Sequence, residues 1–273
     1  MSTEIHAGTL GEIRRAGASK GVACTTTAAI TGLPEGTHWI SLTPRNFSGA
    51  TVVKIALNPY LAIFKTTDLL VAAANYTEYS SEAQDDDTAT LVTLSSLDTL
   101  ANGDALYVGA PIQFSGVYCV VVAANSTASV LTVKYWNGTA WTDTSDTDGT
   151  IVATGKTMGQ SGAVTWAVPS AWTANSLINI GDATLPHSSH LADTYMFWTR
   201  WEVSAALDSS TTLSSMLAMN RSTTYAELVN GQTMEQTILM GLGGFGCVES
   251  LTDAGTANLV INVATRSTSR RFA

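Results

Sequence analysis

Three groups of residues have types and spacings that could support chemistry. The first is an acidic loop in which Asp143, Asp146 and Asp148 precede Gly149. Such a loop can supply the carboxylate oxygens that Ca²⁺ prefers. No Glu follows at the spacing of an EF-hand, however, so a solvated acidic turn is the alternative that we favour.

The second group is His187 and His190 with Asp193, and the third is the glycine run from Gly241 to Gly246. Two imidazoles and a carboxylate could bind zinc, but a zinc site needs a fourth position and supporting hydrogen bonds. We therefore expect a solvated loop there. The glycine run matches G-x-G-x-x-G, yet a β-like segment follows it where the dinucleotide fingerprint needs a helix. We expect a bend.

Residues suited to covalent or acid–base catalysis are not grouped in this sequence. It contains no G-x-S-x-G motif and no cysteine with a persuasive histidine partner. Its carboxylates lie in polar turns, whereas a catalytic carboxylic acid needs an apolar pocket that raises its pKa. The prediction is a protein that is not an enzyme and that uses no cofactor and no metal. The widely spaced Cys24, Cys119 and Cys247 are predicted to be buried free thiols.

The composition favours a protein that acts by assembly. Charged residues make up 13% of the 273 residues, about half the usual share, and the net charge is −9. A general nucleic-acid binder needs clustered Lys and Arg, so we expect no nucleic-acid partner. The span 66–199 carries a net charge of −11, and the remaining ends together carry +2.

The elements that would position these groups are predicted to be strands. Val130 to Trp136 is rich in β-branched and aromatic residues, and Asn137-Gly138 follows as a hairpin signal. Trp136 and Trp141 then share one face of the hairpin, which needs a second layer to cover it. Candidates for that layer are the alternating segment 162–169 and the segment 195–203, which is aromatic on both faces.

The predicted fold is all-β, with an antiparallel, jelly-roll-like β-sandwich inserted into a smaller base domain. Strands at 37–43, 51–57 and 60–65 form a small meander, which strands between 243 and 265 complete. The predicted divisions are an N-terminal arm (1–20), a discontinuous β base domain (21–87 and 223–273) and an aromatic-rich sandwich (88–222).

Four blocks within this sandwich carry a resemblance to a known class of proteins. They are Tyr135-Trp-Asn-Gly-Thr-Ala-Trp-Thr-Asp143, Asp148-Gly149-Thr150, Val164-Thr-Trp-Ala-Val-Pro-Ser-Ala-Trp172 and Trp198-Thr-Arg-Trp-Glu-Val-Ser-Ala-Ala-Leu-Asp208, and the segment 95–109 fits the same pattern. The stretch from Thr88 to Ser214 resembles a module that recurs in virion proteins of tailed bacteriophages, including head decoration (cement) proteins, tail components and fibre-associated pieces.

The resemblance implies a non-enzymatic structural protein of the virion, most simply a capsid decoration or cement protein. Its expected partners are the major capsid protein or other virion proteins and further copies of itself as a homo-oligomer. The first residues show no secretory signal and no apolar run approaches membrane-spanning length, so we expect synthesis in the host cytoplasm and no membrane partner.

In this interpretation the basic ends of the chain grip the shell or a neighbouring copy. The predicted contact residues are Arg14, Arg15, Lys20, Arg266, Arg270 and Arg271. The alternative is a tail, baseplate or fibre-associated module that binds host surface glycan, with Trp172 and Trp201 stacking on sugar rings.

Overall fold

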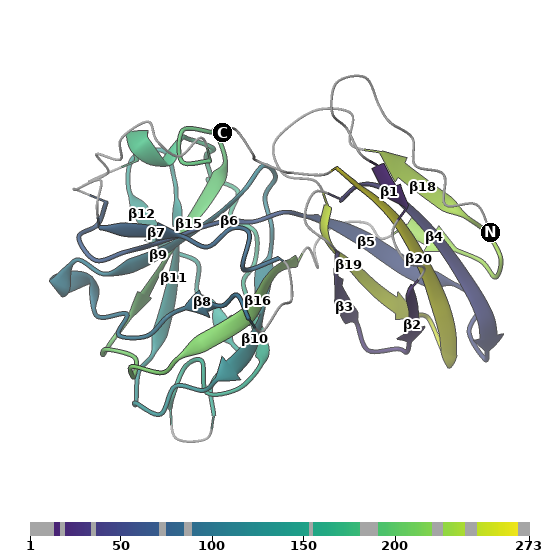
Figure 1. The fold of residues 1–273 in the computed structure, drawn as a ribbon, viewed down its shortest axis with the longest axis horizontal. Coiled ribbons are helices and arrows are strands. Elements are labelled where there is room, and N and C mark those ends of the chain that lie inside the picture. The colour runs from purple at the N-terminus through teal and green to yellow at the C-terminus, as the bar shows by residue number, and fades with distance from the viewer. Residues whose placement is uncertain are drawn as a thin grey trace. The chain divides into compact units, whose positions relative to one another are not determined.

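The computed structural model consists of antiparallel β-sheets (Figure 1). It describes residues 14–16, 20–33, 37–70, 75–84, 89–152, 155–180, 191–219, 226–237 and 245–266. Within these ranges the only helices are two short 3₁₀ turns, η1 (Leu100–Asn102) and η2 (Leu177–Asn179). The predicted all-β, antiparallel class is confirmed. The jelly-roll-like topology remains a prediction.

The chain divides into two compact units. The base unit comprises Met1–Asn58 and Thr223–Ala273, and the inserted unit comprises Pro59–Ser222. Each hydrophobic cluster of buried residues lies wholly within one unit. Each unit therefore has a core of its own.

The base unit contains two sheets. In the first, β20 lies between β4 on one side and β1 and β2 on the other, and β18 pairs with the far side of β4. The strands are β1 (Arg14–Ala16), β2 (Lys20–Cys24), β4 (Thr37–Ser48), β18 (Met234–Thr237) and β20 (Thr256–Arg266). The second sheet has the order β17 (Ala226–Leu228), β5 (Val53–Pro59), β19 (Phe245–Thr252), β3 (Ala29–Gly32).

The core of the base unit lies between these two sheets. Leu259, Ile261 and Val263 alternate along β20 and are buried, as the period of two in the sequence predicts. They belong to one cluster with Ile40 of β4 and Val248 of β19. The unit is thus a two-layer packing of sheets.

The inserted unit contains a five-stranded and a six-stranded sheet. The first has the order β13 (Thr147–Asp148), β14 (Gly162–Thr165), β10 (Gly116–Ala123), β16 (Thr212–Met219), β8 (Val92–Thr93). The second has the order β12 (Trp141–Asp143), β11 (Leu131–Trp136), β15 (Phe197–Val203), β9 (Ala105–Ala110), β6 (Ala62–Thr66), β7 (Tyr76–Glu78). Val133 and Trp201 of one sheet share a core with Val117, Val164 and Met216 of the other.

The predicted hairpin is present, with Trp136 opposite Trp141. Their rings meet edge to face with centroids 5.5 Å apart. The loop is closed by the Asn137 N–H, which donates to the Ala140 carbonyl at 3.1 Å. The Asn137 side chain accepts hydrogen bonds from the Thr139 and Ala140 amides, so this residue stabilises its own turn.

The layer that covers Trp136 differs in part from the predicted one. Trp136 packs on the outer face of the six-stranded sheet with Leu177, Ile180 and Met196, and with Trp198 of its own sheet. Val164 and Trp166 of the segment 162–169 belong to the other core, between the two sheets. The prediction that this segment covers the hairpin tryptophans is therefore wrong.

The boundary between the units also differs from the predicted one. It falls after Asn58, not after Asp87, because β6 pairs with β9 of the inserted unit. Ile63 and Phe64 face the two opposite cores of that unit, which ties this strand to both. The predicted three-strand meander is therefore wrong. Of the predicted N-terminal arm, the described residues are strand β1 and the first residue of β2.

Candidate functional site

Four of the six predicted contact residues lie on neighbouring strands of one sheet. Arg14 and Arg15 are on β1, Lys20 begins β2, and Arg266 ends β20. The register places Arg14 opposite Arg266 and Lys20 opposite Ile261. Arg270 and Arg271 lie outside the described residues. Antiparallel pairing thus brings basic residues from the two ends of the sequence together.

These strands form an edge of the base-unit sheet. In the described sheet order, β1 and β2 both pair with β20 and with no further strand, while β4 occupies the other side of β20. An edge strand presents backbone N–H and C=O groups that another chain can pair with, and proteins commonly place Lys and Arg there to control such pairing. The backbones of Arg14, Arg15 and Lys20 therefore lie on the strands that form this edge.

The two tryptophans of the glycan alternative are buried. Trp172 is 4% exposed and Trp201 is 1% exposed. The Trp172 ring lies 5.1 Å from that of Phe114, and the Trp201 ring lies 6.5 Å from that of Trp166. The Trp172 Nε1–H donates to the Trp198 carbonyl, and the Trp201 Nε1–H donates to the Thr199 hydroxyl. The prediction that these rings stack on sugars is wrong, because both rings are buried in the core between the sheets.

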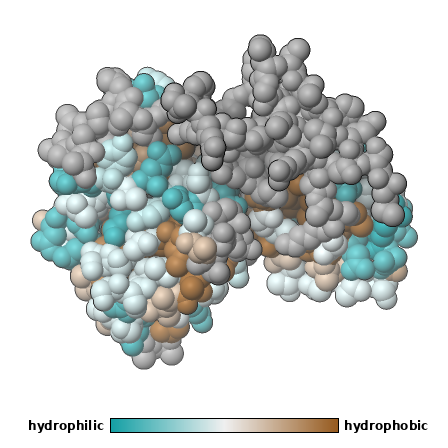
Figure 2. All heavy atoms as spheres, in the orientation of Figure 1, coloured by the Kyte–Doolittle hydropathy of each residue, from teal (hydrophilic) through white to brown (hydrophobic). Residues whose placement is uncertain are grey.

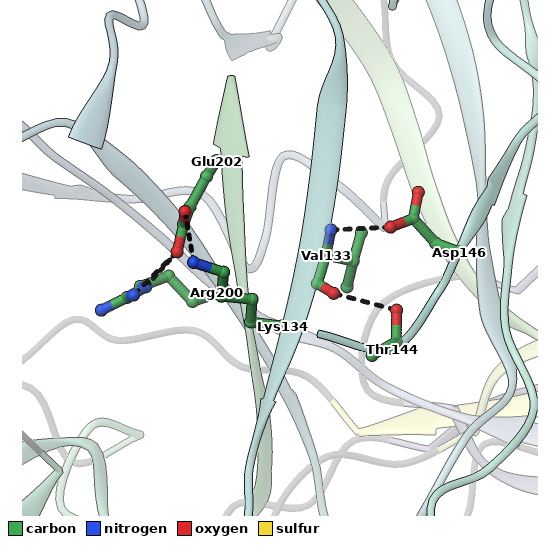
Figure 3. Close-up of polar contacts among 6 residues, drawn as sticks. All are labelled: Val133, Lys134, Thr144, Asp146, Arg200 and Glu202. Carbon is green, nitrogen blue, oxygen red and sulfur yellow. Dashed lines mark hydrogen bonds and ion pairs between the residues drawn. The ribbon is translucent and has the colours of Figure 1, made fainter. Parts of the chain in front are cut away.

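The acidic loop is docked on strand β11 (Figure 3). The Val133 N–H donates to the Asp146 carboxylate at 2.8 Å, and the Thr144 hydroxyl donates to the Val133 carbonyl at 2.9 Å. Asp143 and Asp148 accept hydrogen bonds from the Ser145 and Thr150 amides. The carboxylates thus hold the loop in its conformation. Within the described ranges, no group of three or more His, Cys, Asp or Glu residues could hold a metal ion.

Burial raises the pKa of Asp146 above its ordinary value. The hydrogen bond from the Val133 amide acts in the opposite direction, and the nearby carboxylates of Asp143 and Asp148 raise the pKa further. This carboxylate is therefore held in place at some electrostatic cost.

The other two candidate motifs fall mostly outside the described residues. His187, His190 and the glycines from Gly241 to Gly244 are outside them. Of the glycine run, Gly246 lies in β19, which is a strand and not the helix that a dinucleotide site requires.

An ion-pair cluster on the outer face of the six-stranded sheet was not predicted (Figure 3). Glu202 accepts from the Arg200 guanidinium, with an Nη2–Oε1 distance of 2.7 Å, and its other oxygen lies 2.9 Å from Lys134 Nζ. The Arg200 guanidinium also lies 5.1 Å from the centre of the Trp141 ring. The signal was present in the sequence, because Arg-x-Glu within a strand places both side chains on one face.

Comparison with protein-family models and with curated proteins finds no match to this chain. Among the described residues, no helix has the length and apolar character needed to cross a membrane.

Proposed function

We propose that this chain is a non-enzymatic structural protein of a tailed-bacteriophage virion, acting as a capsid decoration or cement protein. It would stabilise the shell by binding the major capsid protein and neighbouring copies of itself. The sequence resemblance from Thr88 to Ser214 supports this proposal and lies within the inserted unit. The protein would be made in the host cytoplasm and reside in the virion.

The observation that carries the proposal is the burial of the aromatic residues. Five of the six tryptophans of the inserted unit are at most 7% exposed: Trp136, Trp166, Trp172, Trp198 and Trp201. Aromatic side chains that recognise a ligand present a face to it, whereas these rings pack on one another between and over the sheets. Such a unit is suited to be a rigid scaffold.

The distribution of charge supports contacts through the base unit. The inserted unit has fifteen acidic and five basic residues, a net charge of −10, whereas the base unit has a net charge of +1. A strongly charged unit of one sign keeps particles soluble, while the near-neutral unit can approach a surface. Many copies on a symmetric shell would make individually weak contacts effective through multivalency.

The proposal is tested on phage particles made with and without the gene. Mass spectrometry of purified virions should detect the protein, and purified protein should bind particles that lack it. Restoring the protein should raise the temperature at which those particles release DNA. Virions that contain no copy of the protein, together with particles that do not bind it, would contradict the proposal.

A further inference from the structure

The sequence contains three Asn-Gly pairs, and in each of them the glycine has a left-handed backbone. The pairs are Asn102-Gly103, Asn137-Gly138 and Asn230-Gly231, and the glycine φ angles are +90°, +100° and +80° in that order. An Asn-Gly pair can react with itself, because the glycine nitrogen can attack the side-chain carbonyl carbon of the asparagine and displace ammonia. Since the three dipeptides are identical, the structure around each one decides which of them reacts first.

The three glycine N–H groups differ in their hydrogen bonds. The Gly103 N–H donates to the Leu100 carbonyl at 3.0 Å, and the Gly231 N–H donates to the Pro44 carbonyl at 2.7 Å. The Gly138 N–H has no acceptor among the described residues. To attack a carbonyl carbon, the glycine nitrogen must lose its proton, so the first two glycines would each have to give up a hydrogen bond. Gly138 gives up none.

The Asn137 side chain is held with its oxygen toward three donors. Oδ1 accepts from the Thr139 N–H at 2.9 Å, from the Thr139 hydroxyl at 3.0 Å and from the Ala140 N–H at 2.8 Å. Nδ2 donates to the Thr142 hydroxyl at 3.0 Å, which fixes the end of the amide that faces these donors. Attack on Cγ places negative charge on Oδ1, so the three donors stabilise the charge that develops in the reaction.

The hydrogen bond between the Thr139 N–H and Asn137 Oδ1 closes a ring that contains both reacting atoms. The ring passes through Asn137 Cγ and through the Gly138 nitrogen, which is the arrangement of an Asx-turn. Groups that are held together in this way react faster than groups that must first meet. The described surface is mostly hydrophilic or intermediate (Figure 2), and Gly138 and Thr139 are exposed, so water and base can reach the turn.

We propose that Asn137 is a modification site at which the folded chain deamidates itself, ahead of Asn102 and Asn230. The Gly138 nitrogen gives its proton to solvent base and forms a bond to Asn137 Cγ. The Cγ–Nδ2 bond then breaks, and the nitrogen takes up a proton and leaves as ammonia, which gives a cyclic imide. Water adds to one of the two imide carbonyls and opens the ring to aspartate or isoaspartate. This inference does not depend on the proposed function.

Peptide mapping by mass spectrometry tests the order of reaction in the full chain at mildly alkaline pH. In the folded protein Asn137 should deamidate at least about tenfold faster than Asn102 and Asn230, because its oxygen faces preorganised donors. In concentrated urea the three asparagines should react at similar rates, since glycine follows each of them. The inference is overturned if Asn102 or Asn230 reacts as fast as Asn137 in the folded protein, or if the lead of Asn137 persists unchanged in urea.

Two variants of Thr139 test the role of the donors, and neither should disturb folding, because Thr139 is exposed. Thr139→Val removes the hydroxyl that donates to Asn137 Oδ1 and should slow deamidation of the folded protein by about threefold or more. Thr139→Ser keeps a hydroxyl and should react at the rate of the unaltered protein. In urea the three proteins should react alike. Equal rates for Thr139→Val and the unaltered protein in the folded state would contradict the assignment of the hydroxyl as a stabilising donor.

Discussion

At the scale of single residues, the packing of the inserted unit depends on how its tryptophans meet small neighbours. Trp198 of β15 lies opposite Gly109 of β9, and a Cβ added to Gly109 would lie 2.5 Å from the Trp198 ring. The absence of a side chain at residue 109 therefore makes room for a fully buried indole. A glycine within a strand indicates that another group approaches its backbone closely, but the sequence does not identify Trp198 as that group.

We expect Gly109→Ala to destabilise the inserted unit by about 1–3 kcal/mol, the usual cost of overpacking a core. Urea unfolding followed by tryptophan fluorescence measures this. Gly21→Ala is the control for the substitution itself, because the space beside it is open; it lies in the base unit, so its unfolding is followed by far-UV circular dichroism. Equal stability of the two variants would show that the ring of Trp198 does not lie against Gly109.

Trp201→Ala should cost about 3–5 kcal/mol, because it removes a buried indole from the core between the sheets. Tyr195→Ala should change stability by no more than about 0.5 kcal/mol, since Tyr195 is 66% exposed. Both are measured by urea denaturation. A Trp201→Ala variant that is as stable as the unaltered protein would remove this residue from the core.

Glu202→Gln should destabilise the protein by roughly 2–4 kcal/mol, because it leaves the largely buried Arg200 guanidinium without its carboxylate. Lys134→Met should cost less, since Lys134 is the more exposed partner of Glu202. Unfolding of both single variants and of the double variant gives the coupling between them. Independent, additive effects would contradict a shared carboxylate.

Some residue roles followed from the sequence and others did not. Alternating aromatic residues more often pack inward, which indicates that Trp136, Trp166 and Trp198 are core residues, and all three are buried. Trp172 and Trp201 are the residues that the sequence offered for sugar stacking, because a position in a loop or in a strand does not reveal which neighbours cover a ring. The Trp172 ring packs against Phe114, and the Trp201 ring packs against Trp166. In each pair the two residues are distant in sequence.

At the scale of elements, local sequence signals predicted the hairpin of β11 and β12 correctly. The hairpin at 131–143 was predicted because its turn residues and its two aromatic strands are adjacent in sequence. The strand predicted at 37–43 continues to Ser48 in β4. Pro44 is tolerated there because its carbonyl accepts from the Gly231 amide, which shows that the side of the strand lacking an N–H faces away from β20.

The placement of β6 could not be predicted from local signals. It pairs with β9 across an intervening segment that contains β7 and β8, so its neighbour is set by the packing of the whole unit. The same applies to the candidate site, where Arg14 meets Arg266 only through the register of β1 on β20. The sequence indicated basic ends, but it could not indicate that they lie on neighbouring strands of one sheet.

The acidic loop on β11 leads to a prediction on pH. The pKa of Asp146 is raised in the folded protein, so its contribution favours folding below the unfolded carboxyl pKa of about 4 and is lost as pH rises through the folded value. Asp146→Asn should therefore gain stability relative to the unaltered protein between pH 3 and pH 7. Thermal unfolding at a series of pH values measures this difference.

Asp208 provides a control of the opposite sign. Hydrogen bonds from the Ser126 hydroxyl, the Ser210 amide and the Ser126 amide lower the pKa of Asp208. Its contribution to stability is thus complete above the unfolded carboxyl pKa and is lost as pH falls. Asp208→Asn should lose stability relative to the unaltered protein over the same rise in pH. Parallel pH profiles for the two variants would contradict both assignments.

At the scale of the whole molecule, two separable folding units are expected, because each hydrophobic cluster lies within one unit. Residues 59–222 contain all members of two hydrophobic clusters, so we expect this fragment to fold alone and to unfold cooperatively. Dispersed amide signals in NMR spectra of the fragment would support this expectation. A fragment that is unfolded at neutral pH would show that its core depends on the base unit.

Trp39 distinguishes the two units in the complete chain, because it is the only tryptophan of the seven that lies in the base unit. Far-UV circular dichroism reports both units, whereas fluorescence reports mainly the inserted one. Unfolding curves from the two methods should therefore differ. Their coincidence would indicate that the units unfold together.

The opposition of Arg14 and Arg266 has a mechanical consequence. The chain enters β1 and leaves β20 at the same end of this antiparallel pair. A pulling force applied between the two termini would therefore open the backbone hydrogen bonds of the pair one after another, beginning at Arg14, instead of shearing them all at once. The inserted unit would carry no tension until the base unit had unzipped, so a tethered molecule should yield first at low force in its base unit.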